Sequence, residues 1–379
     1  MSYTLAEIDF LIQHQPEIAG LDLEFSKASQ LGDVAKLQQE FGEHARAVAE
    51  LIKARNSKKL PSDWLMDSDS VQQATPLEVA KHRAAFLTSL GVELVHDVTC
   101  SIGTEGAAWA PGKYVGSDLD RSRIKMAQHN TPHPFFCADA LTQSSTAPVI
   151  IADPARRSGG KRITDPAKLL PPLPDLLAAH ECELAVKCAP GLDFSDWQGL
   201  VSVASVDGNV KEACLYTPGL GVGRSAVMIK GGKADVLSNT DFDEADLPEA
   251  DDIGTYIMDP DGAVVRAGLV RHYAKREGLH QLDPRIAYLT GQRIPAGTSG
   301  FEFIEAVPVK KLKAALQSHD AGSLEILVRG LDVDPDQLRK KLKLKGSRSM
   351  AVIMTRIGTK GIALLCGPRV VSSEDNYAT

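Results

Sequence analysis

Apolar residues recur every three to four positions through most of the first sixty residues. The clearest series, which lines one face of a helix, is Leu37, Phe41, Ala45, Val48 and Ile52. The polar run at residues 56–61 ends this pattern, and a short acidic linker containing Trp64 follows. We therefore predict an N-terminal helical domain over residues 1–72 that packs as a cap.

The pattern changes after residue 72. Thr75, Pro76 and Glu78 have the spacing of a capping box, with the hydroxyl at the N-cap and proline at the first helical position, and they predict a helix that runs to about residue 90. Short apolar runs at residues 94–98, 114–117, 149–152 and 184–188 then alternate with segments of helix length. This alternation predicts a parallel sheet with helices on both faces.

The apolar runs at 210–217 and 224–230 flank a turn-rich connector, which predicts an antiparallel pair that closes one edge of the sheet. Residues 234–255 are acidic and show little pattern, so we expect a linker followed by a small helical extension over 233–300. Beyond it we expect a strand, a helix at 310–317, a strand at 324–328, a helix at 334–342 and two strands from residues 350 and 362. This module spans 301–370 and leaves a tail at 371–379.

Charge separates this C-terminal module from the rest of the chain. The whole chain carries a net charge of −7, but residues 301–370 hold thirteen lysines and arginines against seven acidic residues. Six of the basic residues cluster on the second helix of the module and in the loop after it: Arg339, Lys340, Lys341, Lys343, Lys345 and Arg348. The stripe suits phosphate binding, and a solvated helix face is the alternative. Aromatic residues are not interleaved with it, so an RNA contact here would read backbone and shape.

Length and composition exclude several classes of protein. A chain of 379 residues exceeds the usual size of one core, so we expect more than one domain. It has no apolar stretch of the roughly 20 residues that a membrane-spanning helix needs, so we expect a cytoplasmic protein without a membrane partner. Its six cysteines form no C-x-x-C pair and lack histidines at zinc spacing, so we expect neither disulfides nor a metal. The oligomeric state is not indicated.

Polar residues follow three successive strands at one rim of the predicted sheet. A loop of small residues comes after Asp97, Asp118 ends the next strand about twenty residues on, and Asp139 ends the third. Such carboxylates can bind the two hydroxyls of a ribose and the edge of an adenine. Turn formation and helix capping are the alternative roles. The chain contains neither the P-loop pattern nor G-x-G-x-x-G.

The fourth strand ends in Asp153-Pro154-Ala155-Arg156-Arg157. A carboxylate beside a rigid proline can accept a hydrogen bond from an amine and position it, and the arginines can clamp a phosphate. An ordinary proline turn with two solvated arginines is the alternative.

These segments resemble the successive motifs of class I S-adenosylmethionine-dependent methyltransferases over about residues 73–232, and the antiparallel pair at 210–230 is similar to the reversed last strand of that fold. The resemblance implies S-adenosylmethionine (SAM) as cofactor. It assigns cofactor binding to Gln73, Thr75, Asp97, Cys100, Ser101, Ile102, Gly103, Asp118, Leu119, Asp139 and Ala140. It places Asp153, Pro154, Arg156 and Lys187 at the acceptor.

The segments Gln73-Ala74-Thr75-Pro76, Lys81-His82-Arg83-Ala84 and 259–269, together with the basic module, are similar to a smaller group, the bacterial methyltransferases that carry a THUMP-like domain. The implied fold is α/β, a Rossmann-like class I methyltransferase domain at 73–232 with an N-terminal helical cap and a small C-terminal α+β THUMP-like domain. The implied activity is methyl transfer to RNA, either rRNA or tRNA.

Two departures from the family pattern keep the reaction open. Thr99 and Ser101 replace the first two glycines of the usual SAM loop, and Ala155-Arg156 replaces the proline and the aromatic residue that follow Asp-Pro in amine methyltransferases. Methylation at a pyrimidine carbon would need a cysteine nucleophile, for which Cys188 is placed, although a buried apolar cysteine is the commoner role. Glu212 is a further candidate at the rim.

Two other functions remain open. The chain could be a small-molecule methyltransferase whose C-terminal module packs or dimerises, or a non-catalytic RNA-binding protein that retains SAM.

Overall fold

The computed structural model describes residues 3–155, 157–158, 161–162 and 165–373, and the side chains of 157, 158, 161 and 162 are left aside. The chain divides into two compact units, residues 1–223 with 227–235, and residues 224–226 with 236–379. Each unit is considered by itself. Among the described residues, no helix is long and apolar enough to cross a membrane.

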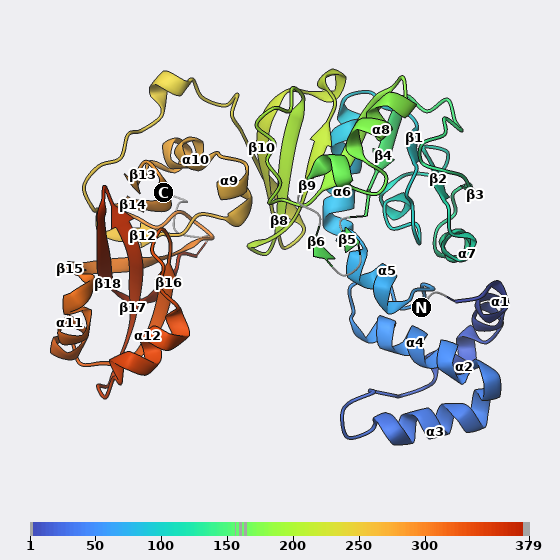
Figure 1. The fold of residues 1–379 in the computed structure, drawn as a ribbon, viewed down its shortest axis with the longest axis horizontal. Coiled ribbons are helices and arrows are strands. Elements are labelled where there is room, and N and C mark those ends of the chain that lie inside the picture. The colour runs from blue at the N-terminus through green and yellow to red at the C-terminus, as the bar shows by residue number, and fades with distance from the viewer. Residues whose placement is uncertain (1–2, 156, 159–160, 163–164, 374–379) are drawn as a thin grey trace. The chain divides into compact units, whose positions relative to one another are not determined.

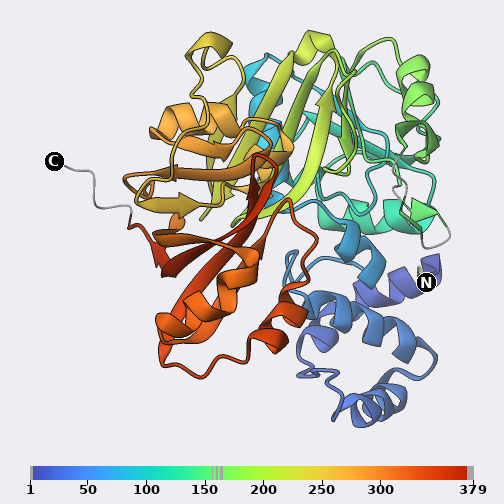
Figure 2. The same cartoon turned by 60° about the vertical axis from the view of Figure 1, so that its left-hand side comes forward.

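The first unit begins with five helices, α1 (Leu5–Gln13), α2 (Gln15–Ala19), α3 (Gln30–Phe41), α4 (Ala45–Asn56) and α5 (Ser68–Gln73). The predicted apolar series is buried, but it runs over two helices, because Gly42 has a positive φ of 51° and ends α3. Helices α3 and α4 lie side by side (Figures 1 and 2). We call residues 3–73 the helical cap.

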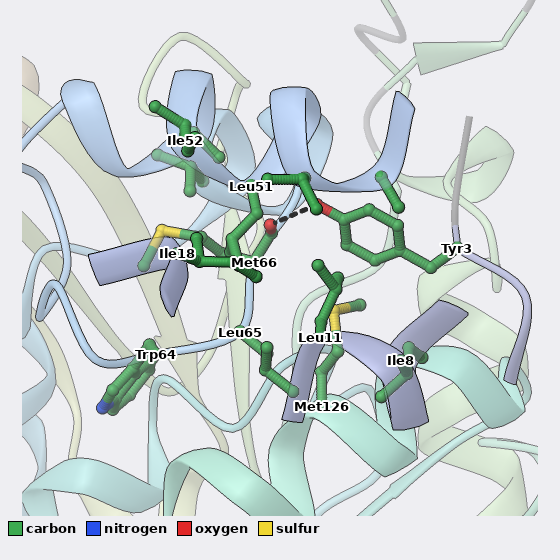
Figure 3. Packing of buried hydrophobic residues seen from close by; sticks show 14 of the residues in the cluster. Tyr3, Ile8, Leu11, Ile18, Leu51, Ile52, Trp64, Leu65, Met66 and Met126 are labelled. Atoms are coloured by element: carbon green, nitrogen blue, oxygen red, sulfur yellow. Dashed lines mark hydrogen bonds between the residues drawn. The ribbon is translucent and has the colours of Figure 1, made fainter. Parts of the chain in front are cut away.

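The cap has its own core, in which Ile8, Leu11, Leu51 and Leu65 pack together (Figure 3). The hydroxyl of Tyr3 donates a 2.9 Å hydrogen bond to the carbonyl oxygen of Met66 and ties the start of the chain to the linker after α4. The cap is therefore a packed element and not a loose extension.

A nine-stranded sheet forms the rest of the first unit. Its order is β11-β10-β8-β9-β7-β4-β1-β2-β3. The strands are β1 (Val95–Asp97), β2 (Tyr114–Asp118), β3 (Phe135–Cys137), β4 (Val149–Ala152), β7 (Glu183–Cys188), β8 (Leu200–Val206), β9 (Asn209–Tyr216), β10 (Gly223–Lys230) and β11 (Lys233–Ser238). The pairs β1–β2, β1–β4, β2–β3 and β4–β7 are parallel, and β9 is antiparallel to β7 and β8. A short pair, β5 (Arg157–Ser158) and β6 (Lys161–Arg162), stands apart from the sheet.

Helix α6 (Leu77–Ser89) precedes β1, and helices α7 (Arg121–Asn130) and α8 (Leu173–Ala179) connect later strands. Ala84 and Leu87 of α6 and Ala127 of α7 pack on Val95 and Ile151 of the sheet. The predicted α/β fold class is confirmed, with β9 reversed between β7 and β8.

Two local predictions were wrong. The segment at 210–217 (β9) does not pair with 224–230 (β10), because the unpredicted strand β8 lies between them. Instead, β9 forms a hairpin with β8, and β10 is the neighbour of β8 and β11. Thr75 does not cap α6: Pro76 occupies the N-cap position, and the threonine hydroxyl bonds to Glu212 instead.

The second unit contains a seven-stranded sheet of order β13-β14-β12-β15-β18-β17-β16. Its elements are β12 (Tyr256–Met258), α9 (Gly262–Arg266), α10 (Val270–Glu277), β13 (His280–Asp283), β14 (Ile286–Gly291), β15 (Ser299–Pro308), α11 (Leu312–Ser318), β16 (Ala321–Val328), α12 (Pro335–Leu342), β17 (Arg348–Ile357) and β18 (Lys360–Val371). Only β16 and β17 form a parallel pair among the strand pairs whose register is described here.

The elements predicted beyond residue 301 are present as β15 to β18 with α11 and α12. Both helices pack on one face of the sheet, where Leu312, Leu316 and Leu342 meet Met350 and Val352 (Figure 2). The expectation for 233–300 was right in part: residues 239–255 contain no α-helix or strand, and α9 and α10 lie in the predicted helical extension, but four strands were missed. That segment supplies β11 to the first sheet and β12, β13 and β14 to the second, because its short runs bury residues such as Ile257, Tyr288 and Leu289.

Candidate active site

The carboxyl ends of β1, β2 and β4 meet at one edge of the first sheet. Parallel pairing aligns Asp97 with Gly116 and with Ile151, and Asp118 with Cys137. Asp97, Asp118 and Asp153 therefore leave the sheet at the same rim, where open α/β sheets bind their ligands. We call this edge the rim.

The loop after β1 folds back toward Asp118. Ser101 and Gly103 have φ angles of 49° and 85°, and the loop turns through them. The backbone N–H of Ser101 donates a 3.0 Å hydrogen bond to Oδ2 of Asp118, and the N–H of Asp120 donates at 2.9 Å to Oδ1. Each carboxylate oxygen keeps a further lone pair, so Asp118 can still accept two hydroxyl groups.

The side chains of this loop point into two different cores. Cys100 packs in the core of the sheet, and Ile102 is fully buried in the core of the helical cap. Only the backbones of these two predicted cofactor residues can face a ligand at the rim.

Asp97 is buried beneath the loop. Its Oδ1 accepts a 3.0 Å hydrogen bond from the N–H of Thr99, and its Oδ2 accepts one at 3.1 Å from the hydroxyl of Tyr114. Burial raises the pKa of Asp97 to about 7, the charge of Lys187 opposes the shift, and Glu105 adds to it. Asp97 therefore titrates near neutral pH.

Three predicted cofactor residues, Leu119, Asp139 and Ala140, lie after β2 and β3. Leu119 is 68% exposed, and its carbonyl accepts a 3.4 Å hydrogen bond from the thiol of Cys137. Asp139 is exposed and accepts a hydrogen bond from the N–H of Leu141, and the carbonyl of the buried Ala140 lies 2.8 Å from Nε2 of His180. An apolar side chain and an acidic turn thus flank the rim on this side.

Gln73 and Thr75 lie at the junction between the cap and α6. Gln73 is the last residue of α5 and is exposed, whereas Thr75 is buried and donates a 3.3 Å hydrogen bond to Oε2 of Glu212 on β9. Of these two predicted cofactor residues, only Gln73 has a side chain open to solvent.

Below the rim lies a buried network of five charged residues, which we call the charge cluster: Arg83 of α6, Glu105 of the β1 loop, Asp153 after β4, Lys187 of β7 and Glu212 of β9. Nε and Nη2 of Arg83 each donate to Glu105 at 3.2 Å, and Nη2 also donates to Oε1 of Glu212. Nζ of Lys187 lies 3.4 Å from Oε1 of Glu105 and 2.9 Å from Oδ2 of Asp153. Three carboxylates therefore share two cations.

In Lys187 and Glu105, neighbouring charges outweigh the effect of burial on the pKa. Burial alone would lower the pKa of Lys187, but Asp153 and Glu105 raise it above its ordinary value. Burial alone would raise the pKa of Glu105, but the charges of Arg83 and Lys187 lower it. Lys187 and Glu105 thus favour their charged forms because of the charges beside them.

Asp153 is the member of the cluster that reaches the rim. Its side chain is 22% exposed, against 6% or less for the other four, and its backbone N–H donates a 2.6 Å hydrogen bond to Oγ1 of Thr99. Pro154 behind it is buried, and Ala155 exchanges backbone hydrogen bonds with Leu170. Arg156 lies outside the described residues.

Sequence reasoning found Asp153 and Lys187 and named Glu212 without a role, but it missed Arg83 and Glu105. One signal was available for Arg83, which lies on the same face of α6 as the buried Val79, Ala80 and Leu87. A lone charge on an apolar helix face has to find a buried partner.

Two remaining side chains bear on the chemistry. Cys188 at the end of β7 is fully buried. Among the described residues, no group of three or more histidine, cysteine, aspartate or glutamate side chains is placed to hold a metal ion.

Comparison with known proteins gives three findings. Residues 298–368 match the family model described as THUMP domain-like. The chain is 42% identical over 364 residues to an uncharacterized S-adenosylmethionine-dependent methyltransferase of Mycobacterium tuberculosis, in strains CDC 1551 / Oshkosh and ATCC 25618 / H37Rv, with 88% of this chain and 99% of the relative covered. A crystal structure of a candidate methyltransferase from Porphyromonas gingivalis W83 superposes with a TM-score of 0.69 at 18% identity, over 97% of this chain and 99% of that one. The last similarity is one of fold.

Proposed function

Because this chain belongs to a family of S-adenosylmethionine-dependent methyltransferases with a THUMP-like domain, and is therefore an enzyme with SAM as its cofactor, we propose that its methyl acceptor is RNA. The observation that carries the proposal is the charge of one face of the second unit. The two helices on that face, the 3-10 turn that precedes α11, and the loop and first strand residue that follow α12 present nine exposed basic residues: Lys310, Lys311, Lys313, Arg339, Lys340, Lys341, Lys343, Lys345 and Arg348. We call this surface the basic face.

The basic face suits a phosphate backbone. Leu312, Leu316 and Leu342 fix both helices on the sheet, so the charges are held on one surface of the unit. Residues 304–376 contain no phenylalanine, tyrosine or tryptophan on which a base could stack. Contacts of this kind read backbone and shape, which favours a folded RNA over an unpaired strand.

We place the cofactor at the loop 99–103 and Asp118. The small side chains and left-handed turns of the loop allow close approach, and the free lone pairs of Asp118 suit the two hydroxyls of a ribose. Leu119 offers an apolar surface and Asp139 a polar edge to the adenine. The excess of carboxylates in the charge cluster favours a cationic sulfonium. These features fit SAM, which supplies an electrophilic methyl group when bound.

Asp153 then faces the acceptor. Lys187 holds its carboxylate and Thr99 holds its backbone N–H, so the partly exposed carboxylate can accept a hydrogen bond from an N–H of the acceptor and orient that nitrogen. In amine methyltransferases with the Asp-Pro-Pro-aromatic motif, an aromatic side chain stands at the position of Arg156, and this sequence has no aromatic residue there. We therefore expect the flanking RNA contacts, rather than stacking in the pocket, to present the base.

The experiment is transfer of tritium from methyl-labelled SAM into size-fractionated total RNA from a strain that lacks this gene. We expect label in one RNA class with the wild-type chain and none with Asp153→Ala, while SAM still binds the variant. No label in RNA, despite demonstrable SAM binding, would favour a small-molecule acceptor. Equal labelling by Asp153→Ala would remove the role assigned to this residue.

A second measurement tests the basic face. The double variant Lys340→Glu/Lys341→Glu should weaken binding of the labelled RNA class. It should also reduce the slope of the logarithm of the binding constant against the logarithm of salt concentration by about 1 for each lysine, because a phosphate contact that no longer forms no longer releases a counterion. The matched control is Lys27→Glu/Lys36→Glu, which makes the same charge change at exposed positions of the helical cap. Equal slopes for the two double variants would contradict RNA binding at the basic face.

A further inference from the structure

The loop proposed to hold the cofactor is attached to the helical cap through one side chain. Asn130, the last residue of α7, donates from Nδ2 to the carbonyl of Ile102 at 3.0 Å and to the carbonyl of Leu65 at 2.9 Å. Its Oδ1 accepts a 2.8 Å hydrogen bond from the N–H of Leu65. The partners fix the orientation of the amide, since a flip would set two carbonyls against an oxygen.

The segment on the other side of Asn130 is itself fixed by the cap. The carbonyl of Trp64 accepts hydrogen bonds from Nε and Nη2 of Arg55 at 3.2 and 3.0 Å, and the carbonyl of Met66 accepts one from Tyr3. Leu65 between them is fully buried in the core of the cap, near Leu11 and Met126 (Figure 3). Three consecutive residues of the linker are thus held by the helices around them.

Packing ties the loop to the same place. The side chain of Ile102 belongs to the core of the cap, as does Met126 of α7. A Cβ on Gly103 would lie 3.2 Å from Oγ1 of Thr131 and 3.3 Å from Cβ of Ala127, so the loop rests directly on the end of α7. Each residue from Cys100 to Gly103 therefore has a defined contact: Cys100 packs on the sheet, the N–H of Ser101 donates to Asp118, and Ile102 and Gly103 pack against the cap and the end of α7.

We infer that the helical cap is part of the cofactor site and that Asn130 is the residue that positions the SAM loop. Asn130 orders the backbone at Ile102, and the neighbouring Ser101 can then direct its N–H to Asp118. A loop without this tether has more conformations to lose on binding, so affinity for SAM should fall even though Asn130 does not reach the cofactor. The inference rests on the proposed cofactor position and not on RNA as the acceptor.

The test is the dissociation constant of SAM, measured by titration calorimetry on the full chain at a temperature where every variant is folded. Asn130→Ala should weaken SAM binding about tenfold, a change in binding free energy about the size of one net hydrogen bond. Asn130→Asp keeps the shape and the bond to the N–H of Leu65, but it sets an oxygen against the carbonyls of Ile102 and Leu65, so it should weaken SAM binding at least as much as Asn130→Ala.

The matched control is Ser122→Ala on the same helix. Oγ of Ser122 donates a 2.7 Å hydrogen bond to the carbonyl of Tyr3, so this variant also loosens the cap from α7 but leaves the loop untouched. We expect it to lower the melting temperature without changing the affinity for SAM. If Asn130→Ala binds SAM within twofold of Ser122→Ala, the inference is overturned.

Asp118→Ala separates the two possible failures. If it abolishes SAM binding while Asn130→Ala has no effect, the cofactor position stands and only the role of Asn130 falls. If neither variant affects binding, the cofactor position is wrong and the inference falls with it.

Discussion

Arg83→Met is the substitution whose effect the structure defines most sharply. Methionine keeps the length of the side chain within the apolar surroundings and removes the guanidinium. Among the described residues, Glu105 then retains the contact with Lys187 at 3.4 Å, and Glu212 retains the hydrogen bond from the hydroxyl of Thr75 at 3.3 Å. Removing one partner from a buried ion pair costs about 3–5 kcal/mol, because the remaining charge stays desolvated. At roughly 2–4 °C per kcal/mol for a unit of this size, the melting temperature should fall by about 10 °C.

The three tryptophans allow this loss to be measured in the correct unit. Trp64, Trp109 and Trp197 all lie in the first unit, so the fluorescence change during urea unfolding reports on that unit alone. The linear dependence of the unfolding free energy on urea then gives the difference between wild type and variant.

A second variant tests the physical cause. Glu212→Gln removes one of the two carboxylates that Arg83 neutralises, so Arg83→Met/Glu212→Gln should lose less stability than the sum of the two single losses, by about 1–3 kcal/mol. A loss below about 1 kcal/mol for Arg83→Met, or strict additivity in the double variant, would refute the view that these charges depend on one another.

Three further predictions follow from the rim. The folded pKa of Asp97 lies near 7, above its unfolded value, so between about pH 4 and pH 7 the folded state binds a proton that the unfolded state does not, and stability falls as pH rises through that window. Asp97→Asn should remove this pH-dependent loss of unfolding free energy, which is on the order of 4 kcal/mol, and give a flatter curve of melting temperature against pH. Parallel curves for wild type and variant would contradict the raised pKa. Gly103→Ala should weaken SAM binding more than tenfold and lower stability by about 1–3 kcal/mol, because the new Cβ meets Thr131 in a left-handed turn. The control Gly112→Ala, with φ of 83° and open space around it, should lower stability without changing SAM binding. Equal SAM affinities for the two variants would contradict the cofactor position at this loop. Cys188→Ala should retain methyl transfer in the tritium assay, and loss of label would indicate a cysteine nucleophile and a carbon acceptor.

The rim could be predicted because its residues stand at fixed positions in the chain. Asp97, Asp118 and Asp153 each follow a short apolar strand, and parallel pairing brings such ends together whatever the details of packing. The loop at Ser101 to Gly103 was recognisable from its small residues. Its side chains could not be placed, because the core that receives Ile102 is built by helices that precede it by more than thirty residues.

The charge cluster could not be predicted in the same way. Arg83, Glu105 and Glu212 come from a helix, a loop and a reversed strand, and only the folded sheet brings them together. The strand β8 is a different case, since its signal was present. Asp207-Gly208, both with positive φ, is the favoured turn of a two-residue hairpin, and it links β8 to β9. The connector at 218–223 also has the composition of a turn, so the hairpin was predicted there instead.

The charge cluster also constrains how this sequence can drift. A change at Arg83, Glu105 or Glu212 alone strands a charge in the interior, so an isolated substitution is selected against even when it leaves the rim untouched. Replacement of the whole set by apolar residues of similar volume removes that penalty, but it also removes Glu105, one of the two carboxylates paired with Lys187. Natural variants should therefore exchange these positions together, and an engineer who wants to stabilise this protein should redesign them as a group or leave all of them alone.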